Sequence, residues 1–196
     1  MAATAQRLYS IEEYLAMEDQ NLEKSEYYDG EIIPMAGAEY NHNLITANVI
    51  TALNIALDPK ADNYRVLSSD MKIQIPALRS FLYPDAVVIC EAPDFYEGRE
   101  DIITNPLLVV EVISRSTQRY DQRGKFEHYK TLPSFQEYVL IHQRFPRVTA
   151  SCKIAERTWQ DTEADSLEQT IYLRSLDITI DVKRLYKGVT FIASPI

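Results

Sequence analysis

The sequence predicts an α/β domain with a central mixed β-sheet, helices on its faces and a β-rich C-terminal extension. Three observations carry this prediction. Apolar residues recur at helical spacing between residues 45 and 57, and "LLVVEVI" at 107–113 is a short apolar run of the kind found in buried strands. From residue 147 onward, apolar and polar residues alternate as they do in antiparallel strands.

The size and composition of the chain fit one compact domain, which we assign to residues 1–196. With 196 residues, of which 46% are hydrophobic and 25% charged, the chain is long enough for one core and short for two. Its two cysteines, Cys90 and Cys152, fall in strand-like segments and form neither a C-x-x-C pair nor a zinc spacing. We therefore expect both to be reduced thiols.

The charge and the N-terminal segment restrict the class of protein. Twenty Lys and Arg against 29 Asp and Glu give 20 − 29 = −9, which disfavours sequence-independent binding to phosphate backbones. The segment "MAATAQRLYSIEEYL" has no apolar signal core, and no apolar run approaches the roughly 18 residues that span a bilayer. We therefore expect a cytosolic protein.

Three signals place the elements of the N-terminal third. Ser10, followed three residues later by Glu13, is a capping box that starts a short helix. Asp29-Gly30 between two β-prone runs is the strongest short signal for a hairpin. The apolar residues of the 45–57 segment share one helical face, and this helix is expected to stop before Pro59.

The rest of the chain mixes strand candidates with a loop, a helix and a turn. The patterns predict strands at 64–69, 71–76, 83–90, 107–113 and 137–142, a helix at 120–132, and a polar loop of functional length at 91–106. Further strands are expected at 147–154 and 169–182, separated by an acidic turn at 160–169. No repeat or linker divides these elements, so we assign them to one fold.

An acid stands inside the most apolar of the predicted strands. Glu111 lies among leucine, valine and isoleucine, where a carboxylate costs several kcal/mol or more unless something pairs with it or neutralises it. Asp85 lies in "YPDAVV", a strand expected to pair with that of Glu111 across the 91–106 loop. If both carboxylates point to the same end of the sheet, they form an oxygen site suited to Mg²⁺.

Structural alternatives exist for each of these residues. An Asp after Pro often starts a strand, and a Glu in a strand can lie at an edge or pair with an arginine. Asp121 and Lys125 stand at i and i+4, which as a surface ion pair contributes about 0.3–0.5 kcal/mol. Alternatively, Lys125 turns toward the strand of Glu111, where it could orient a water or stabilise phosphoryl charge.

Longer motifs resemble a known family. "YPDAVVIC", "LLVVEVISRST" and "YDQRGKFEHYKTLPSFQEYVLI" resemble the Uma-two family of the PD-(D/E)XK restriction-endonuclease-like superfamily. "SEYYDGEIIPM" followed by His42, and "LRSLDITIDVKRLYKGV" near the end, look like the family's two ends, so the likeness spans nearly the whole chain. Arg115 departs from it, because relatives usually show a proline there. The resemblance implies a restriction-endonuclease-like sheet flanked by helices.

The resemblance also implies roles for individual residues. Glu26 matches an acid that such nucleases place early in the fold, Asp85 the acid of the PD element, and Glu111 the acid of the E-x-K element. The sequence departs from the superfamily pattern at Ile113, where the E-x-K lysine should stand. The lysine of this family looks as if it has moved to the following helix, which makes Lys125 the candidate.

The function implied is a Mg²⁺-dependent (or Mn²⁺-dependent) endonuclease that hydrolyses phosphodiester bonds of DNA. Asp85 and Glu111, with a backbone carbonyl near Val112, would hold the metal, Lys125 would position the attacking water, and Glu26 would complete the site. The β-rich segment from about residue 147 could supply a homodimer interface.

A function of another class is the alternative. In it, the chain is a non-catalytic interaction or regulatory protein that keeps the nuclease fold. The acidic charge and the displaced lysine favour this alternative, whereas the retention of all three acids and a lysine favours the enzyme.

Overall fold

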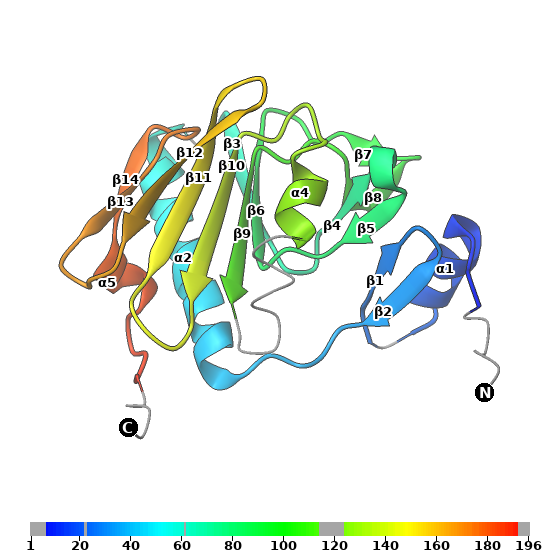
Figure 1. Cartoon of the computed structure of the whole chain (residues 1–196), viewed down its shortest axis with the longest axis horizontal. Coiled ribbons are helices and arrows are strands. Elements are labelled where there is room, and N and C mark those ends of the chain that lie inside the picture. Colours follow the sequence, from blue (N-terminus) through cyan, green and yellow to red (C-terminus); the bar gives the residue numbers. More distant parts are fainter. Residues whose placement is uncertain (1–6, 22, 61, 114–123, 192–196) are drawn as a thin grey trace.

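The computed structural model describes residues 7–21, 23–60, 62–113 and 124–191, and these form two six-stranded sheets, a two-stranded sheet, one long helix and several short ones (Figure 1). The helices are α1 (Ile11–Glu18), α2 (Tyr40–Leu57), α4 (Phe126–Tyr129) and α5 (Val182–Leu185), with 3₁₀ turns at Asp58–Lys60 and Pro76–Leu78. The predicted α/β class is confirmed. No helix in the described part of the chain is both long enough and apolar enough to cross a membrane.

The first sheet contains the N-terminal hairpin. Its strands lie in the order β2 (Glu31–Pro34), β1 (Ser25–Tyr28), β5 (Ser80–Leu82), β4 (Lys72–Ile75), β8 (Arg99–Ile103) and β7 (Phe95–Tyr96). The Asp29-Gly30 signal is confirmed, since both residues take positive φ (42° and 107°) and join β1 to β2. The capping box of α1 is confirmed too, because Ser10 and Glu13 each bond the other's backbone N–H.

The second sheet is mixed. Its order is β12 (Thr158–Ala164), β11 (Val148–Ala155), β10 (Glu137–His142), β9 (Leu108–Ile113), β6 (Ala86–Cys90) and β3 (Tyr64–Ser68), and a separate pair joins β13 (Thr170–Leu173) to β14 (Ile178–Asp181). Strands β9 and β10 run parallel, and β6 pairs antiparallel with β9. The predicted pairing of the strands that carry Asp85 and Glu111 is therefore correct.

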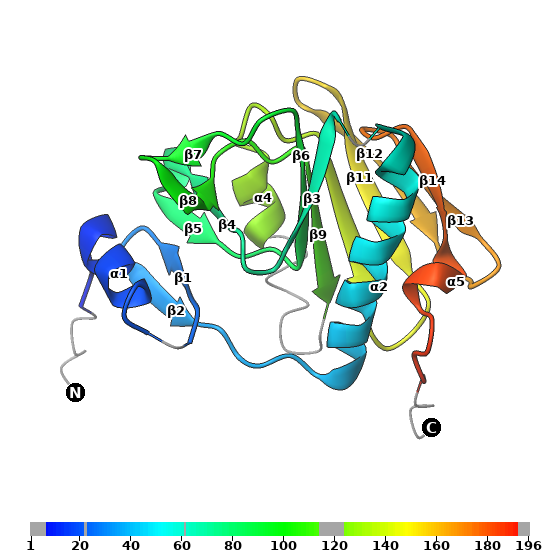
Figure 2. The same ribbon diagram turned by 180° about the vertical axis from the view of Figure 1, so that it is seen from behind.

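Both faces of the central strand β9 are covered, which explains its apolar sequence. Val110 and Val112 pack with Ile45 and Val49 of α2, which lies across one face of the second sheet (Figure 2). Val109 faces the other way, into a cluster that also contains residues of α4 and of the first sheet. Because strand side chains alternate, Glu111 shares the face of Val109 and points between the two sheets.

Three sequence-based expectations need correction. The 91–106 segment is not a free loop, because β7 and β8 form within it and extend the first sheet. The segment at 160–169 is partly strand: β12 runs to Ala164 as a sheet edge, where exposed acidic side chains are tolerated. Strand β5 was not predicted, because three residues are too few to show an alternation.

The helix predicted at 120–132 is shorter where it is described. Helix α4 ends at Tyr129 and gives way to a turn before Pro133, a residue that cannot continue a helix. Arg115 and the predicted Asp121 partner of Lys125 lie outside the described residues.

Candidate functional site

The buried acid of β9 has partners from α4 and the residue before it. The Glu111 side chain accepts from Lys125 Nζ, which lies 3.3 Å from Oε1 and 3.5 Å from Oε2, and from the Tyr129 hydroxyl at 3.4 Å. Glu111 is only 3% exposed, so these contacts replace the hydration that the carboxylate loses on folding. Among the described residues, Lys125 is the cation that contacts the buried acid.

A second acid reaches the same lysine from the first sheet. Glu26 lies in β1, and its Oε1 is 2.9 Å from Lys125 Nζ. The same oxygen accepts the backbone N–H of Tyr83 at 3.1 Å, while Oε2 accepts the Tyr28 hydroxyl at 2.6 Å. Strand β1 therefore brings Glu26, which is far from Glu111 in sequence, into one buried cluster with it.

Lys125 lies between the two sheets and closes the cluster. It directly precedes α4, is 6% exposed, and its ammonium also donates to the carbonyl oxygen of Tyr83 at 3.2 Å. The side chain therefore points inward, as the migrated-lysine hypothesis requires. Within the described residues, the ammonium contacts Glu26, Glu111 and the Tyr83 carbonyl, and each of these can accept one of its N–H donors.

Asp85 stands at the end of β6 beside this cluster. Ala86 pairs with Val110 in the antiparallel register of β6 and β9. The residue before Ala86, Asp85, therefore stands opposite the residue after Val110, Glu111. Oδ2 of Asp85 accepts the backbone N–H of Val112 at 2.6 Å and lies 3.3 Å from Nε2 of His42 on α2. The Asp85 side chain is 15% exposed, so it is the most accessible of the three acids.

The site is negatively charged overall. Counted formally over the described residues, Asp85, Glu26 and Glu111 against Lys125 give −3 + 1 = −2. In the described ranges, no three His, Cys, Asp or Glu side chains gather as a ready metal cluster, and no donor bonds to Oδ1 of Asp85. One open carboxylate oxygen and a neighbouring acid still fit Mg²⁺, which takes one or two carboxylates and completes its shell with waters and phosphate.

Sequence patterns did not predict three residues of the site, which are His42, Tyr28 and Tyr83. The three histidines have no metal-ligand spacing, yet His42 is the side chain beside Asp85. Tyr28 donates to Glu26 through its hydroxyl, and Tyr83 contacts Glu26 and Lys125 through its backbone. The position of Tyr83, two residues before Asp85, was the signal that could have found it. Tyr129, which bonds Glu111, continues the helical face of Lys125 four residues later.

Tyr83 also links the site to a second buried charge pair. Its hydroxyl donates to Oε2 of Glu18 at 2.8 Å, and the same oxygen lies 3.3 Å from Lys72 Nζ. Burial raises the pKa of Tyr83 far above its usual range, so the hydroxyl remains a donor. Burial also lowers the pKa of Lys72, an effect that Glu18 opposes. A single residue thus contacts the site through its backbone and α1 through its side chain.

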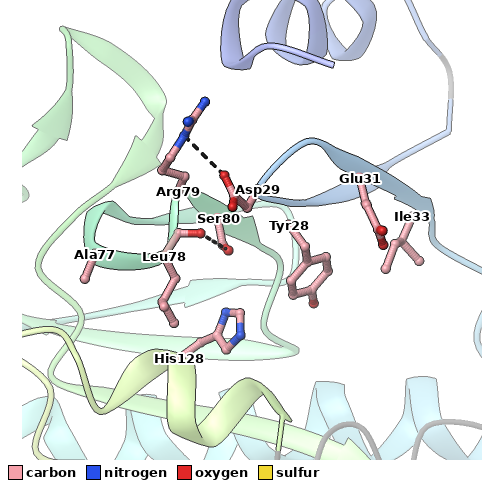
Figure 3. A pocket seen from close by; sticks show the side chains of 9 residues that line it. All are labelled: Tyr28, Asp29, Glu31, Ile33, Ala77, Leu78, Arg79, Ser80 and His128. Carbon is pink, nitrogen blue, oxygen red and sulfur yellow. Dashed lines mark hydrogen bonds and ion pairs between the residues drawn. The ribbon is translucent and has the colours of Figure 1, made fainter. Parts of the chain in front are cut away.

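A pocket opens next to Glu26 (Figure 3). Its volume is about 470 Å³, and it is lined by Tyr28, Asp29, Glu31, Ile33, Ala77, Leu78, Arg79, Ser80 and His128. The rings of Tyr28 and His128 meet edge to face with centroids 5.5 Å apart. Because Tyr28 donates to Glu26, one wall of this pocket belongs to the charged cluster.

Known proteins match most of the chain. The family Uma2, described as "Putative restriction endonuclease", matches residues 11–183. Two uncharacterized proteins of Synechocystis sp. (strain ATCC 27184 / PCC 6803 / Kazusa) are similar: sll1609 is 40% identical over 163 residues, and slr1290 is 34% identical over 182. The first alignment covers 83% of this chain and 91% of the relative, and the second covers 93% of each.

The fold has a counterpart among solved structures. A crystal structure from Anabaena variabilis, described as "a putative nuclease belonging to DUF820", superposes with a TM-score of 0.72 over 93% of this chain and 99% of its own. At 17% identity, this likeness shows a shared fold. The match over residues 11–183 establishes that the chain belongs to the Uma2 family.

Proposed function

We propose that this chain hydrolyses phosphodiester bonds of DNA with the help of Mg²⁺ or Mn²⁺. The observation that carries the proposal is the Lys125 ammonium held between Glu26 and Glu111, beside the strand end that carries Asp85. Carboxylates on neighbouring strands with an ammonium next to them are the parts that phosphoryl transfer needs. The family match supports a nuclease, and the metal, the DNA substrate and the role of the lysine are our additions.

Asp85 and Glu111 would hold the cation, with a carbonyl near Val112 as a further ligand. When bound, the cation would supply Lewis-acid stabilisation of the phosphate and a more acidic water. The described contact of Val112 is its N–H bond to Asp85, which fixes the orientation of that carboxylate. No donor from the described residues bonds to the other oxygen, Oδ1, which would be the oxygen of Asp85 that meets the cation.

Lys125 would donate to the attacking water or to a phosphate oxygen. Three acceptors among the described residues already contact its ammonium, so at least one contact must open before Lys125 can bind substrate. The contacts to Glu111 are the longest, at 3.3 and 3.5 Å, and are the ones we expect to open. Glu26, fixed by Tyr28 and by the Tyr83 N–H, would keep the ammonium in place during this exchange.

The contacts that surround the Lys125 ammonium also favour the second candidate function. If all three contacts persist, Lys125 is a buried structural cation, and the fold serves in non-catalytic interaction or regulation. The two functions differ in one property, which is whether Lys125 becomes available to a phosphate.

A cleavage assay separates the two. The full chain is incubated with single-stranded, double-stranded and branched DNA, with Mg²⁺, with Mn²⁺ and with EDTA. The enzyme predicts metal-dependent cleavage that Asp85→Asn and Glu111→Gln each abolish, whereas Asp94→Asn, an exposed acid away from the site, cuts normally. No cleavage of any substrate by the folded wild-type chain would establish the non-catalytic alternative.

We also propose a homodimer that works in the cytosol. The β-rich segment from about residue 147 would supply the interface. Light scattering coupled to size-exclusion chromatography tests the dimer, and a single monomer mass over the working concentration range would refute it.

A further inference from the structure

One turn carries positive charge in a chain whose net charge is −9. Residues 142–147, "HQRFPR", join β10 to β11 and contain two arginines and no acid. Arg144 and Phe145 are exposed, and Arg144 makes no ion pair with any described residue. An unpaired arginine next to an exposed aromatic ring is the combination that binds a single strand of nucleic acid.

The turn is held in a fixed shape. The Phe145 ring, 42% exposed, stacks on His142 with centroids 4.5 Å apart and an interplanar angle of 21°. The buried Tyr186 hydroxyl closes the base of the turn through the carbonyls of His142 and Arg147, each 2.9 Å away. A surface that is ordered before binding loses less entropy when a ligand arrives.

Arg147 has a different part in this arrangement. Its guanidinium lies 5.5 Å from the Phe145 ring centroid, and its Nε is 3.2 Å from Glu163. Because these contacts already occupy the side chain, Arg147 supports the ring, and Arg144 is the arginine that can meet a phosphate.

The turn adjoins the candidate active site. Strands β9 and β10 run parallel, so His142 pairs with Ile113, two residues beyond Glu111. The Gln143 N–H donates to the carbonyl of Ile113 at 3.3 Å, and its side chain donates to Glu39, which directly precedes α2, at 2.9 Å. The turn and the start of α2 therefore lie at the end of the second sheet where β9 and β10 terminate (Figure 1).

We propose that the β10–β11 turn binds single-stranded DNA next to the site, with Arg144 on a backbone phosphate and Phe145 stacked on an unpaired base. This inference rests on the proposed nuclease function and adds the surface that guides the substrate. It also resolves the conflict between a nucleic-acid substrate and an acidic chain, because a local basic and aromatic element is enough to attract one strand. A ring that needs an unpaired base gives the surface a preference for single strands over duplexes.

Fluorescence anisotropy with labelled DNA in EDTA measures binding without cleavage. The probes are a mixed-sequence single strand and the matching duplex, and the protein is the full chain. Arg144→Ala should weaken the binding of both probes by about tenfold. It should also reduce the slope of log Kd against log salt concentration by about one, because one phosphate contact is lost. Phe145→Ala should weaken single-strand binding by about five- to a hundredfold and leave duplex binding nearly unchanged.

Matched controls come from the opposite end of β11. Arg157 and Ile154 are exposed there, and Arg157→Ala and Ile154→Ala remove a guanidinium and an apolar side chain away from the site. Both should bind DNA like the wild type. Equal losses in the turn variants and the controls, or no loss in the turn variants, would overturn the inference.

The outcomes keep the inference apart from the proposed function. If the wild type cuts DNA and the turn variants bind it normally, the proposed nuclease function is supported and the proposed DNA-binding role of the β10–β11 turn is wrong. If the wild type binds DNA through the turn but never cuts it, the DNA-binding role of the turn is supported and the proposed nuclease function is wrong. A wild-type chain that binds no DNA refutes both.

Discussion

Nζ of Lys125 lies 3.3 Å from Oε1 of Glu111, and both side chains are almost fully buried. The same ammonium is 2.9 Å from Glu26, so two carboxylates from different sheets share one cation. Removal of one partner from a buried ion pair leaves an uncompensated charge, which costs far more than a surface pair contributes. The stability of the fold and the chemistry of the site therefore depend on the same lysine.

Lys125→Met tests this dependence. The substitution roughly keeps the side-chain length but removes the cation that Glu26 and Glu111 both contact, so we expect a loss of about 3–5 kcal/mol in the free energy of unfolding. Urea denaturation followed by circular dichroism measures it. Lys183→Met, at an exposed lysine of α5, is the control and should change stability by less than about 0.5 kcal/mol. Equal effects of the two substitutions would show that the buried pair carries no stability.

Metal binding should appear in thermal melts. At free Mg²⁺ of about ten times the dissociation constant, the linkage gain is roughly 1.4 kcal/mol, which raises the melting midpoint by about 3–6 °C. Asp85→Asn and Glu111→Gln should each remove most of that rise, and Asp94→Asn should retain it. A wild-type midpoint that ignores both Mg²⁺ and Mn²⁺ would end the metal-site proposal.

The hydroxyl of Tyr83 should stabilise the fold through Glu18. Tyr83→Phe removes the donor of a 2.8 Å hydrogen bond to a buried carboxylate, and we expect a cost of about 1–3 kcal/mol. Tyr172→Phe is the matched control, because its hydroxyl also bonds an aspartate at 2.8 Å but at an exposed position. That control should cost less than about 0.5 kcal/mol. Similar losses for both tyrosines would show that burial adds nothing at Tyr83.

Acidification should destabilise the chain through its histidines. Burial lowers the pKa of His128 and of His142 in the folded state, so below about pH 6.5 the unfolded chain binds protons more tightly. Stability then rises with pH up to about 6.5 and falls on acidification, by at most about 1.4 kcal/mol per pH unit for each histidine. Melts between pH 7.5 and 5 should show a shallower slope for His128→Gln. An unchanged slope would contradict the assignment to His128.

A methyl group should be tolerated at Gly37, which follows the N-terminal hairpin, and not at Gly30 in its turn. Gly30 has φ of +107°, and a Cβ there would lie 3.1 Å from Leu8, so Gly30→Ala should cost about 1–3 kcal/mol. Gly37 has open space and no positive φ, and Gly37→Ala should be nearly neutral. Differential scanning calorimetry compares the two. A neutral Gly30→Ala would show that the turn relaxes without strain.

The parts of the fold that could be predicted are those with local signals. The helix of α2 has an apolar face, the β1–β2 turn has Asp29-Gly30, and α1 has its capping box, and each signal lies within a few residues of the element that it specifies. Strands β5, β7 and β8 have no such signal. They are two to five residues long, and they form because the first sheet offers them partners from elsewhere in the chain.

The site shows the same division. Asp85, Glu111 and Lys125 could be named from an acid in an apolar strand and from a family resemblance, and their strands pair as expected. The partners of these residues could not. The contact of His42 with Asp85 depends on how α2 crosses the second sheet, and the three bonds of Tyr83 depend on where β5 ends. Such contacts are set by tertiary packing rather than by spacing.

The position of Glu26 in the first sheet has a consequence for synthesis of the chain. Strand β1 is anchored to β5 by only two residue pairs, and the cation of Glu26 follows 125 − 26 = 99 residues later. A ribosome makes the chain from its N-terminus, so the β1–β2 hairpin emerges long before the strand and the lysine that accommodate its carboxylate. A buried acid without a cation is unfavourable, and we therefore expect nascent chains that end before Lys125 to leave Glu26 in water. The β1–β2 hairpin would thus be synthesised before Lys125 but dock only after it.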